Sequence, residues 1–358
     1  MGKLKFWAVT GAMLVSLLAQ PAAANDSTAR VGAGGLELVK SDAIRMVEEI
    51  LEISPTRIRV RYKFLNDGKT DVTTIVAFPM PRFGWNPGEA QIDANVGPMS
   101  SFETRADGQK VKTSVDTKAF LKGKDISALL RAQGYTEKEM VDVMSCNLGA
   151  VSEGQCIAES IVKRIPGIAE GGHPNFSVQQ TAWWEQQFPA GKIVEIEHSY
   201  QPKVGNVYQI YNYYNYYNYP NGKPDDSDLL RPWAPGGNSG LESGRGACTH
   251  EGGDDAVISR AKRLQNLNDG EVWLTLNDLE YVLGTGRNWK GPIDSFTLRI
   301  EKASPDQIVS LCFPGKSRQV DRRTLEFKAT QFVPPDDLIV YFYTVKTSGQ
   351  IERELRTK

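Results

Sequence analysis

Two alternating apolar runs flank a glycine-rich connection in residues 276–300, which read Leu276-Asn-Asp-Leu-Glu-Tyr-Val-Leu283, Gly284-Thr-Gly-Arg-Asn-Trp-Lys-Gly-Pro292 and Ile293-Asp-Ser-Phe-Thr-Leu-Arg-Ile300. Alternation with a period of two is typical of half-buried β-strands, and a connection with three glycines and a proline predicts a structured loop between them. Trp289 lies in this loop, where its ring can close the end of a β-sandwich or face a partner. The pattern predicts a β fold and names no reaction.

The same alternation recurs along the chain. Ile58, Val60, Tyr62 and Phe64 are expected on one face of a strand, with basic residues between them. Asn66-Asp67-Gly68 predicts a tight turn, after which residues 72–78 should return as the neighbouring strand. Further strands are expected near residues 31–39, 46–53, 102–105, 111–115, 176–188, 192–200, 272–276, 308–313, 324–332 and 338–345. We therefore expect a mainly β fold made of two antiparallel β-sandwich-like domains.

Helical spacing interrupts this pattern once in the first half. Apolar residues in 121–165 recur at helical intervals, and Thr136-Glu-Lys-Glu139 is a capping-box motif that predicts the start of a short helix. The expected division is a signal peptide (1–24), an N-terminal β-sandwich (25–205) with this helical insertion, a Tyr/Asn- and Gly/Pro-rich linker or long loop (206–255), and a C-terminal β-sandwich (256–358) that begins with one helix.

The first 24 residues predict export. Lys3 and Lys5 precede an apolar run from Phe6 to Leu18, and Ala22-Ala23-Ala24 supplies the small residues that signal peptidase needs. Cleavage is expected after Ala24; a retained anchor is the alternative, but the run is short for a span of ~20 residues. We expect a periplasmic or secreted protein without an integral membrane segment after cleavage.

The charge of the expected mature chain argues against a nucleic-acid partner. Cleavage would remove two lysines and no acidic residue, which leaves 40 basic and 43 acidic side chains, a net charge of −3. Nucleic acids and anionic membrane surfaces attract strongly basic proteins, so neither is an expected partner.

The cysteine count predicts disulfide bonds. Four cysteines in an oxidising compartment allow three pairings, and we favour Cys146–Cys156 and Cys248–Cys312 because each pair then lies within one half of the chain. A metal site at Cys248, His250 and Glu251 would need a free thiolate, which a disulfide removes. We predict no metal and no cofactor.

No catalytic arrangement stands out. Hydrolysis needs a nucleophile beside a base, or two carboxylates across one bond. The chain has neither a Gly-x-Ser-x-Gly motif nor a His-Glu-x-x-His motif. His198 alternates with Val194 and Ile196, as expected of a structural histidine at the edge of a core. No catalytic residue is predicted.

Aromatic side chains are the better candidates for a binding surface. Trp183 and Trp184 are adjacent on a predicted strand and must point to opposite faces. Residues 208–219 form a tract of tyrosines and asparagines, which could stack on sugars or dock a protein. A low-complexity loop, or a pairing strand that covers the domain junction, remains the alternative. The candidate binding residues are Trp183, Trp184, Tyr211, Tyr213, Tyr214, Tyr216, Tyr217 and Trp289.

Several segments, taken in order, carry a family resemblance: Asn25-Asp-Ser-Thr-Ala with Gly32-Ala-Gly-Gly-Leu, Val60-Arg-Tyr-Lys-Phe-Leu-Asn, Ala77-Phe-Pro-Met-Pro, Gly286-Arg-Asn-Trp-Lys-Gly-Pro-Ile after Tyr281, and Ser310-Leu-Cys-Phe. They cover most of the expected mature chain, which resembles an exported bacterial family known as domain of unknown function 4424. The resemblance implies an exported β-rich protein of unassigned activity and transfers no catalytic residue.

The sequence favours a non-enzymatic binding protein of the bacterial envelope, with an envelope protein or glycan as its partner. The alternative is an envelope hydrolase or carbohydrate-active enzyme that uses loop carboxylates and exposed tryptophans. Fold alone does not decide between them.

Overall fold

The computed structural model describes residues 25–32, 35–85, 98–146, 156–202, 204–211, 259–261, 263–264, 267, 271–311, 313–314, 317–335 and 337–356. Within them the chain is mainly β, with several antiparallel sheets and few helices, and its sandwich-like arrangement confirms the predicted fold class. No helix in this part of the chain has the length and apolar character that a membrane crossing needs.

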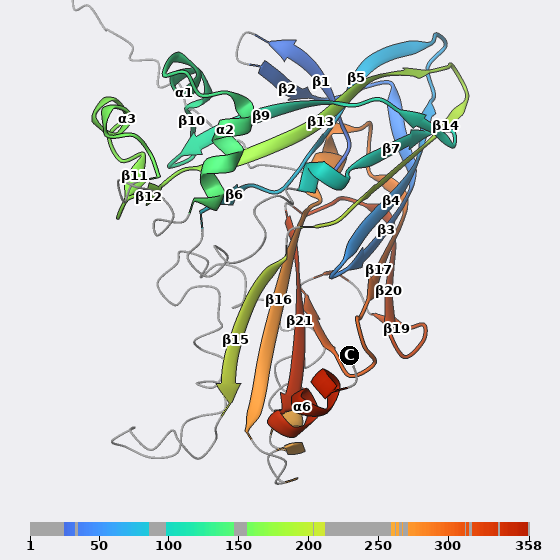
Figure 1. The fold of residues 1–358 in the computed structure, drawn as a ribbon. Helices are drawn as coiled ribbons and strands as arrows, with labels where there is room; N and C mark the ends of the chain where they lie inside the picture. The colour runs from blue at the N-terminus through green and yellow to red at the C-terminus, as the bar shows by residue number, and fades with distance from the viewer. Residues whose placement is uncertain are drawn as a thin grey trace, which may run out of the picture.

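An eight-stranded sheet runs through both halves of the chain (Figure 1). Its order is β19 (Arg318–Gln319), β20 (Thr324–Phe332), β17 (Ile293–Glu301), β3 (Ile44–Ser54), β4 (Arg57–Asn66), β14 (Ile193–Tyr200), β7 (Glu103–Ala106) and β8 (Gln109–Val111). β3 and β17 are parallel, and the other neighbours are antiparallel.

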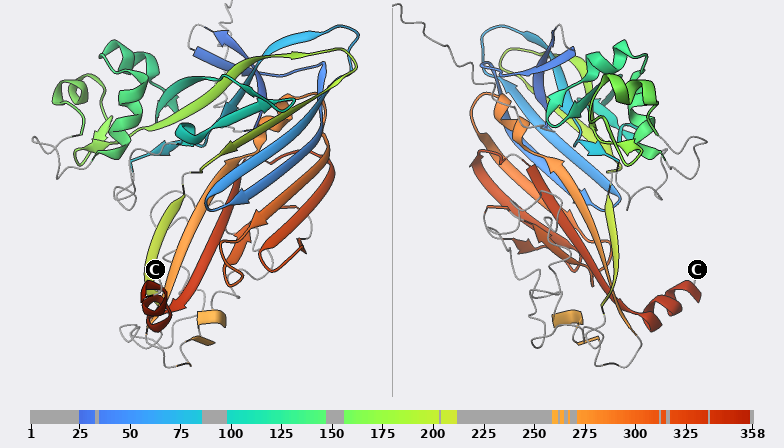
Figure 2. Two further views of the ribbon diagram at one scale, coloured as in Figure 1. Left: turned by 45° about the vertical axis from the view of Figure 1, so that its right-hand side comes forward. Right: turned by 90° about the vertical axis from the view of Figure 1, so that its left-hand side faces the viewer.

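Two smaller sheets lie beside the eight-stranded sheet, one at the top and one lower in the views of Figure 2. The seven-stranded sheet contains β10 (Lys124–Asp125), β9 (Ser114–Leu121), β13 (Ser177–Phe188), β5 (Val72–Pro79), β1 (Ser27–Gly32) and β2 (Gly35–Val39), with β6 (Phe83–Gly84) beside β13. The four-stranded sheet contains β15 (Gly205–Tyr211), β16 (Val272–Val282), β21 (Asp337–Thr347) and β18 (Ile308–Leu311). β11 (Ala169–Glu170) and β12 (His173–Pro174) form a separate hairpin.

The helices are short. The helices whose bounds are described are η1 (Pro98–Ser101), α1 (Ser127–Ala132), α2 (Glu137–Asp142), η2 (Val143–Ser145), α3 (Glu159–Arg164), η5 (Gly284–Asn288) and α6 (Ser348–Arg356). α1, α2 and α3 fall in the predicted insertion. The capping box of Thr136 and Glu139 is present at the start of α2.

One hydrophobic cluster joins the layers. It takes side chains from β3, β4, β14, β17 and β20 of the long sheet, from β5 and β13 of the seven-stranded sheet, and from β16, β18 and β21 of the four-stranded sheet. Ile58, Val60, Tyr62 and Phe64 are all buried in it, as their alternation predicts.

The predicted domain boundary is therefore not a break in the structure. β3 from the first half pairs with β17 from the second, from Ser295 opposite Glu48 to Ile300 opposite Ile53. Apolar side chains on the inner face of a continuous sheet share one core, so the two halves are joined by a ladder and by packing.

A second correction concerns the strands that follow sharp turns. β5 does not return beside β4 as predicted: it crosses to the seven-stranded sheet and pairs with β13 and β1. β13 likewise leads into β14 in the other layer. Asn66 ties the two crossings together, because its Nδ2 donates to Phe188 O at 2.7 Å and its own carbonyl accepts from Gly191 N at 2.8 Å.

Candidate functional site

Eight polar residues meet inside the main core and are almost fully enclosed. We call this group the polar core; its members are Asn25, Asp26, Glu49, Tyr62, Thr104, His198, Tyr281 and Thr285, none more than 1 % exposed. They come from the segment before β1, from five strands of two sheets, and from the η5 loop. Buried polar groups are costly unless they are paired, so the partners of these eight define what the site does.

A β-bulge in β3 brings Glu49 into this core. The register with β4 shifts between Met46 and Glu48, and Val47 and Glu48 are both only half-buried. Because a bulge adds one residue to one strand, Met46 and Glu49 point to the same inner face although they are three residues apart. This bulge also explains why the sequence of β3 alternates weakly.

Asn25 forms hydrogen bonds through both its main chain and its side chain. Its backbone nitrogen donates to Thr285 Oγ1, and the hydroxyl of Tyr62 donates to its Oδ1. Its Nδ2 lies 3.2 and 3.1 Å from the two carboxyl oxygens of Glu49. An asparagine that uses its main chain, its amide oxygen and its amide nitrogen within a core fixes the path of the chain there.

Asp26 continues the network. Its Oδ1 lies 3.0 Å from Nε2 of His198, and Nδ1 of the same ring lies 3.0 Å from Oγ1 of Thr104. Its carbonyl oxygen accepts a hydrogen bond of 2.6 Å from Nε1 of Trp289. Both ring nitrogens of His198 thus have partners, and its alternation with Val194 and Ile196 on the inner face of β14 is confirmed.

Burial dominates the electrostatics of this site. It raises the pKa of Glu49 to about 8, although the hydrogen bond from Asn25 acts in the opposite direction. It also raises the pKa of Asp26, against the charge and hydrogen bond of His198. The pKa values of Tyr62 and Tyr281, whose hydroxyls lie 3.3 Å apart, are raised well above the ordinary tyrosine value for the same reason. These hydroxyls therefore stay protonated and act as donors.

The η5 loop closes the site. At Gly286 an added Cβ would lie 2.9 Å from Nδ2 of Asn25 and 3.0 Å from Cγ of Pro334, so only glycine allows this approach. Trp289 follows at the end of the loop and is 3 % exposed, with its ring 4.4 Å from that of Phe64. Of the two positions considered for Trp289, it occupies the one that closes the sandwich.

The polar core is built to hold a chain segment. Its acids, its histidine and its tyrosines are enclosed, and their hydrogen bonds are made mainly to Asn25, Asp26 and each other. A substrate would need a cleft that reaches these groups. We therefore regard the polar core as an anchor for residues 25–27.

A hollow lies on the outer face of the eight-stranded sheet. It has a volume of about 460 Å³ and crosses β3, β4, β14 and the turn between β7 and β8. Its charged lining residues are Glu48, Arg61, Lys63, Arg105, Glu195 and Glu197. Cations and anions therefore alternate around it.

The comparisons with known proteins give a family without an assigned activity. A family model described as Domain of unknown function (DUF4424) matches residues 24–341. The chain belongs to this family. No curated protein matches it.

Two solved structures are similar to this chain over part of their length. One is a protein of Legionella pneumophila, provisionally described as nutrient-binding, at 14% identity and a TM-score of 0.41, with 90% of this chain and 70% of that chain covered. The other is an M1 zinc metallopeptidase from Deinococcus radiodurans, at 10% identity and a TM-score of 0.23. The match covers 85% of this chain and 43% of the peptidase. Likenesses of this size carry no argument about activity.

Among the described residues, the three predicted tryptophans do not form one exposed surface. Trp184 and Trp289 are each 3 % exposed, so the binding role expected for them has no support in this geometry. Trp183 is half-buried beside Ala29, Leu36 and Ala77, which confirms that the adjacent tryptophans face opposite ways.

The tyrosine tract is described only at its start. Tyr211 ends β15, opposite Val272 of β16, so this part of the tract is a pairing strand. Tyr213, Tyr214, Tyr216 and Tyr217 lie outside the described residues.

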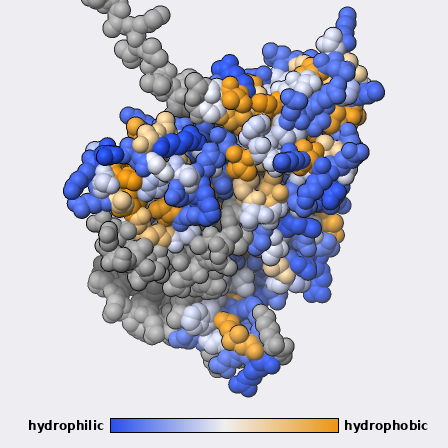
Figure 3. All heavy atoms as spheres, turned by 45° about the horizontal axis from the view of Figure 1, so that its top comes forward, coloured by the Kyte–Doolittle hydropathy of each residue, from blue (hydrophilic) through white to orange (hydrophobic). Residues whose placement is uncertain are grey.

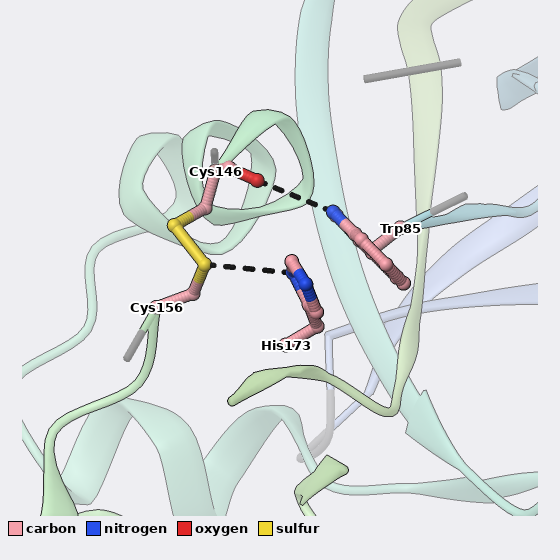
Figure 4. The surroundings of a disulfide bond; sticks show 4 residues. All are labelled: Trp85, Cys146, Cys156 and His173. Carbon is pink, nitrogen blue, oxygen red and sulfur yellow. Dashed lines mark hydrogen bonds between the residues drawn. A yellow bond between two sulfur atoms is a disulfide. The ribbon is translucent and has the colours of Figure 1, made fainter. Parts of the chain in front are cut away.

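The disulfide between Cys146 and Cys156 is present, as predicted (Figure 4). Trp85 donates from Nε1 to the carbonyl of Cys146 at 3.2 Å and stacks on His173 at 3.5 Å between ring centroids. The contacts of Trp85 thus connect the residues around the disulfide to the segment that follows β6. Cys248 and Cys312 lie outside the described residues, so their pairing stays a prediction.

Sequence reasoning missed Asn25, Asp26 and Glu49. The first two follow the predicted cleavage site, where polar residues resemble a solvated tail. Glu49 lies next to Glu48, and only the bulge decides which of them points inward. The one available signal was that Asn25-Asp26 begins the first segment of the family resemblance.

Proposed function

We propose that this protein is an exported, non-catalytic binding protein of the bacterial envelope, and that it binds a protein partner at the hollow of the eight-stranded sheet. The observation that carries the proposal is the hollow itself, an open depression on a broad sheet with side chains of both charges around it. A rim of both signs complements a polypeptide surface that also carries both signs.

The ion pairs around the hollow are easily exchanged. Lys63 and Glu48 are 2.9 Å apart with side chains 40% and 35% exposed, and Arg59 pairs with Glu197 in the same way. Exposed pairs of this kind contribute only ~0–1 kcal/mol to stability, so a partner can replace one member at little cost.

The described surface in one view of the molecule is mainly hydrophilic. In Figure 3, hydrophilic side chains cover much of the described surface in view, and the hydrophobic ones lie in small separate groups. Polar recognition at a shaped site fits this surface better than docking on a broad apolar patch.

The acids of the polar core give the hydrolase alternative no support. Its mechanism needs carboxyl groups that flank a bound substrate. Asp26 and Glu49 have raised pKa values, but both are enclosed in the polar core.

Crosslinking in the intact envelope tests the proposal. The unmodified protein is compared with Arg61→Glu/Lys63→Glu at the hollow and with Lys138→Glu/Lys163→Glu on the exposed faces of α2 and α3. The hollow variant should lose a protein partner that the unmodified chain and the control both capture. Capture of the same proteins by the unmodified chain, the hollow variant and the control variant would contradict the proposal.

A second arm separates the hollow from the tyrosine tract. A variant with serine at Tyr211, Tyr213, Tyr214, Tyr216 and Tyr217 should still capture the partner. Loss of the partner in this variant alone would move the binding surface to the tract, and recovery of glycan in place of protein would overturn the assigned partner.

A further inference from the structure

The polar core contains two carboxyl groups and one basic side chain among the described residues. Asp26 and Glu49 are fully buried, and His198 is the one basic side chain that contacts either of them among the described residues. Oδ2 of Asp26 has no hydrogen-bond partner there, and no described lysine or arginine forms an ion pair with either carboxyl group. A buried carboxylate without a paired charge is costly, so the described cluster lacks one cation.

The α-nitrogen of Asn25 is well placed to supply this cation. It donates to Thr285 Oγ1, and Nδ2 of the same residue lies 3.1 and 3.2 Å from the carboxyl oxygens of Glu49. Four bonds separate the two nitrogens. A charge on the α-nitrogen would therefore belong to the same residue whose amide contacts Glu49, and an opposite charge within ~4–6 Å favours an ionised carboxyl group. The bond before this nitrogen is the predicted signal-peptide cleavage site.

We propose that removal of residues 1–24 frees the α-amino group of Asn25, and that the resulting ammonium binds inside the polar core, paired with Glu49 and held by Thr285. In the cleavage, water adds across the Ala24–Asn25 amide. The carbonyl carbon of Ala24 takes the hydroxyl group, the nitrogen of Asn25 takes a proton, and a further proton from solvent gives the ammonium. The ligand of this site is therefore the chain's own amino terminus.

Such a site couples export to the completion of the fold. While residue 24 is attached, the nitrogen of Asn25 is a neutral amide, and no lysine or arginine of the described residues pairs with Glu49. After cleavage the same atom carries a charge at the position where one is lacking. The inference rests on cleavage at this bond and does not depend on the proposed binding function.

The competing explanation is that Glu49 stays protonated in the finished protein and needs no cation. The two explanations differ in what glutamine does at this position. Glutamine resembles a protonated glutamate in shape and charge, so Glu49→Gln should be mild if the acid is neutral. If the ammonium is bound, Glu49→Gln should destabilise the fold because it removes one member of a buried charge pair.

Unfolding by urea tests the proposal on four forms of the mature chain: one that starts at Asn25, one that keeps Ala24, and the Glu49→Gln variant of each. At pH 7 the unfolding equilibrium constant should be at least about tenfold higher for the form that keeps Ala24 than for the form that starts at Asn25. In the Glu49→Gln pair this difference should shrink below about threefold.

Three controls make the result decisive. Glu52→Gln, on the outer face of the same strand, should leave the tenfold difference intact. The wild-type chain with an acetylated Asn25 should behave like the form that keeps Ala24. Mass analysis of the exported protein should show Asn25 as its first residue.

Equal stability of the forms with and without Ala24 would overturn the proposal. So would a difference that persists in full in the Glu49→Gln pair, because then the extra residue would disturb packing and not a charge pair. An exported chain that begins at another residue would overturn it as well. Loss of partner capture at the hollow would leave all these outcomes unchanged.

Discussion

Gly286 allows the η5 loop to approach the amino-terminal segment, and a single methyl group tests that contact. In Gly286→Ala the new Cβ would lie 2.9 Å from Nδ2 of Asn25, closer than such atoms approach, so either the loop or Asn25 must move. We expect a loss of about 1–3 kcal/mol in the free energy of unfolding, measured by urea denaturation.

Gly84→Ala is the control for this contact. Its nearest neighbour would be the carbonyl oxygen of Phe176 at 3.4 Å, an ordinary contact, and little change in stability is expected. Equal losses in both variants would mean that Gly286 has no special role.

The raised pKa of Glu49 predicts a pH dependence for the form that keeps Ala24. Its carboxyl group titrates at about 8 in the folded chain and at 4.5 in the unfolded chain, so the folded state binds the extra proton between these values. Stability should therefore fall by up to a few kcal/mol as pH rises from about 5 to 8. The groups that face Glu49 are Asn25, Asp26, Tyr62 and Tyr281, and the two tyrosines stay neutral in this window.

Urea midpoints at pH 5, 6, 7 and 8 measure this slope. Glu49→Gln should reduce this slope, although the raised pKa of Asp26 contributes a dependence of the same sign, whereas Glu52→Gln should leave the slope unchanged. A flat profile in the form that keeps Ala24 would show that Glu49 is not the titrating group.

At the scale of elements, the bulge in β3 sets which side chains reach the core. Deletion of Val47 removes the unpaired residue and leaves Met46, Glu49 and Leu51 on the inner face of a regular strand. We expect this variant to fold, with a loss below about 2 kcal/mol. The measurement is far-UV circular dichroism with thermal unfolding.

Deletion of Arg61 is the matched control in β4, where the alternation is regular. It moves Tyr62 and Phe64 to the outer face, and we expect it to prevent folding. If both deletion variants fold with equal stability, the bulge does not determine which side chains of β3 point into the core.

Periodicity in the sequence predicted which face of a strand is buried but not which strand lies beside it. Ile58, Val60, Tyr62 and Phe64 are buried as expected, because alternation reports burial directly. The crossing of β5 into the other layer depends on hydrogen bonds of Asn66 to residues over one hundred positions away. Local patterns carry no information about such contacts.

The candidate site was hidden for a related reason. His198 was predictable as a core residue because it alternates with apolar neighbours. Asn25 and Asp26 have no such pattern, and their burial arises from partners at residues 49, 62, 198 and 285. When the members of a network come from distant segments, no single segment shows a sequence period that would predict it.

At the scale of the whole molecule, the shared sheet predicts that the two halves depend on each other. If the chain is cut between residues 220 and 250 and both parts are co-expressed, β3 should still pair with β17, and β15 with β16. We expect the two parts to co-purify as one particle and neither to fold alone, because each would expose half of a common core. Size-exclusion chromatography and circular dichroism of each part test this. Two separately folded parts would restore the division that the sequence predicts.

The most direct test of the buried amino terminus is a carbon-13 NMR titration of the Glu49 carboxyl group. It compares the chain that starts at Asn25 with the chain that keeps Ala24. With Ala24 in place, the pKa of Glu49 should be about 8. In the chain that starts at Asn25, the ammonium should lower it to about 5–7, because an opposite charge nearby favours the ionised form. The same pKa in both chains would contradict the account.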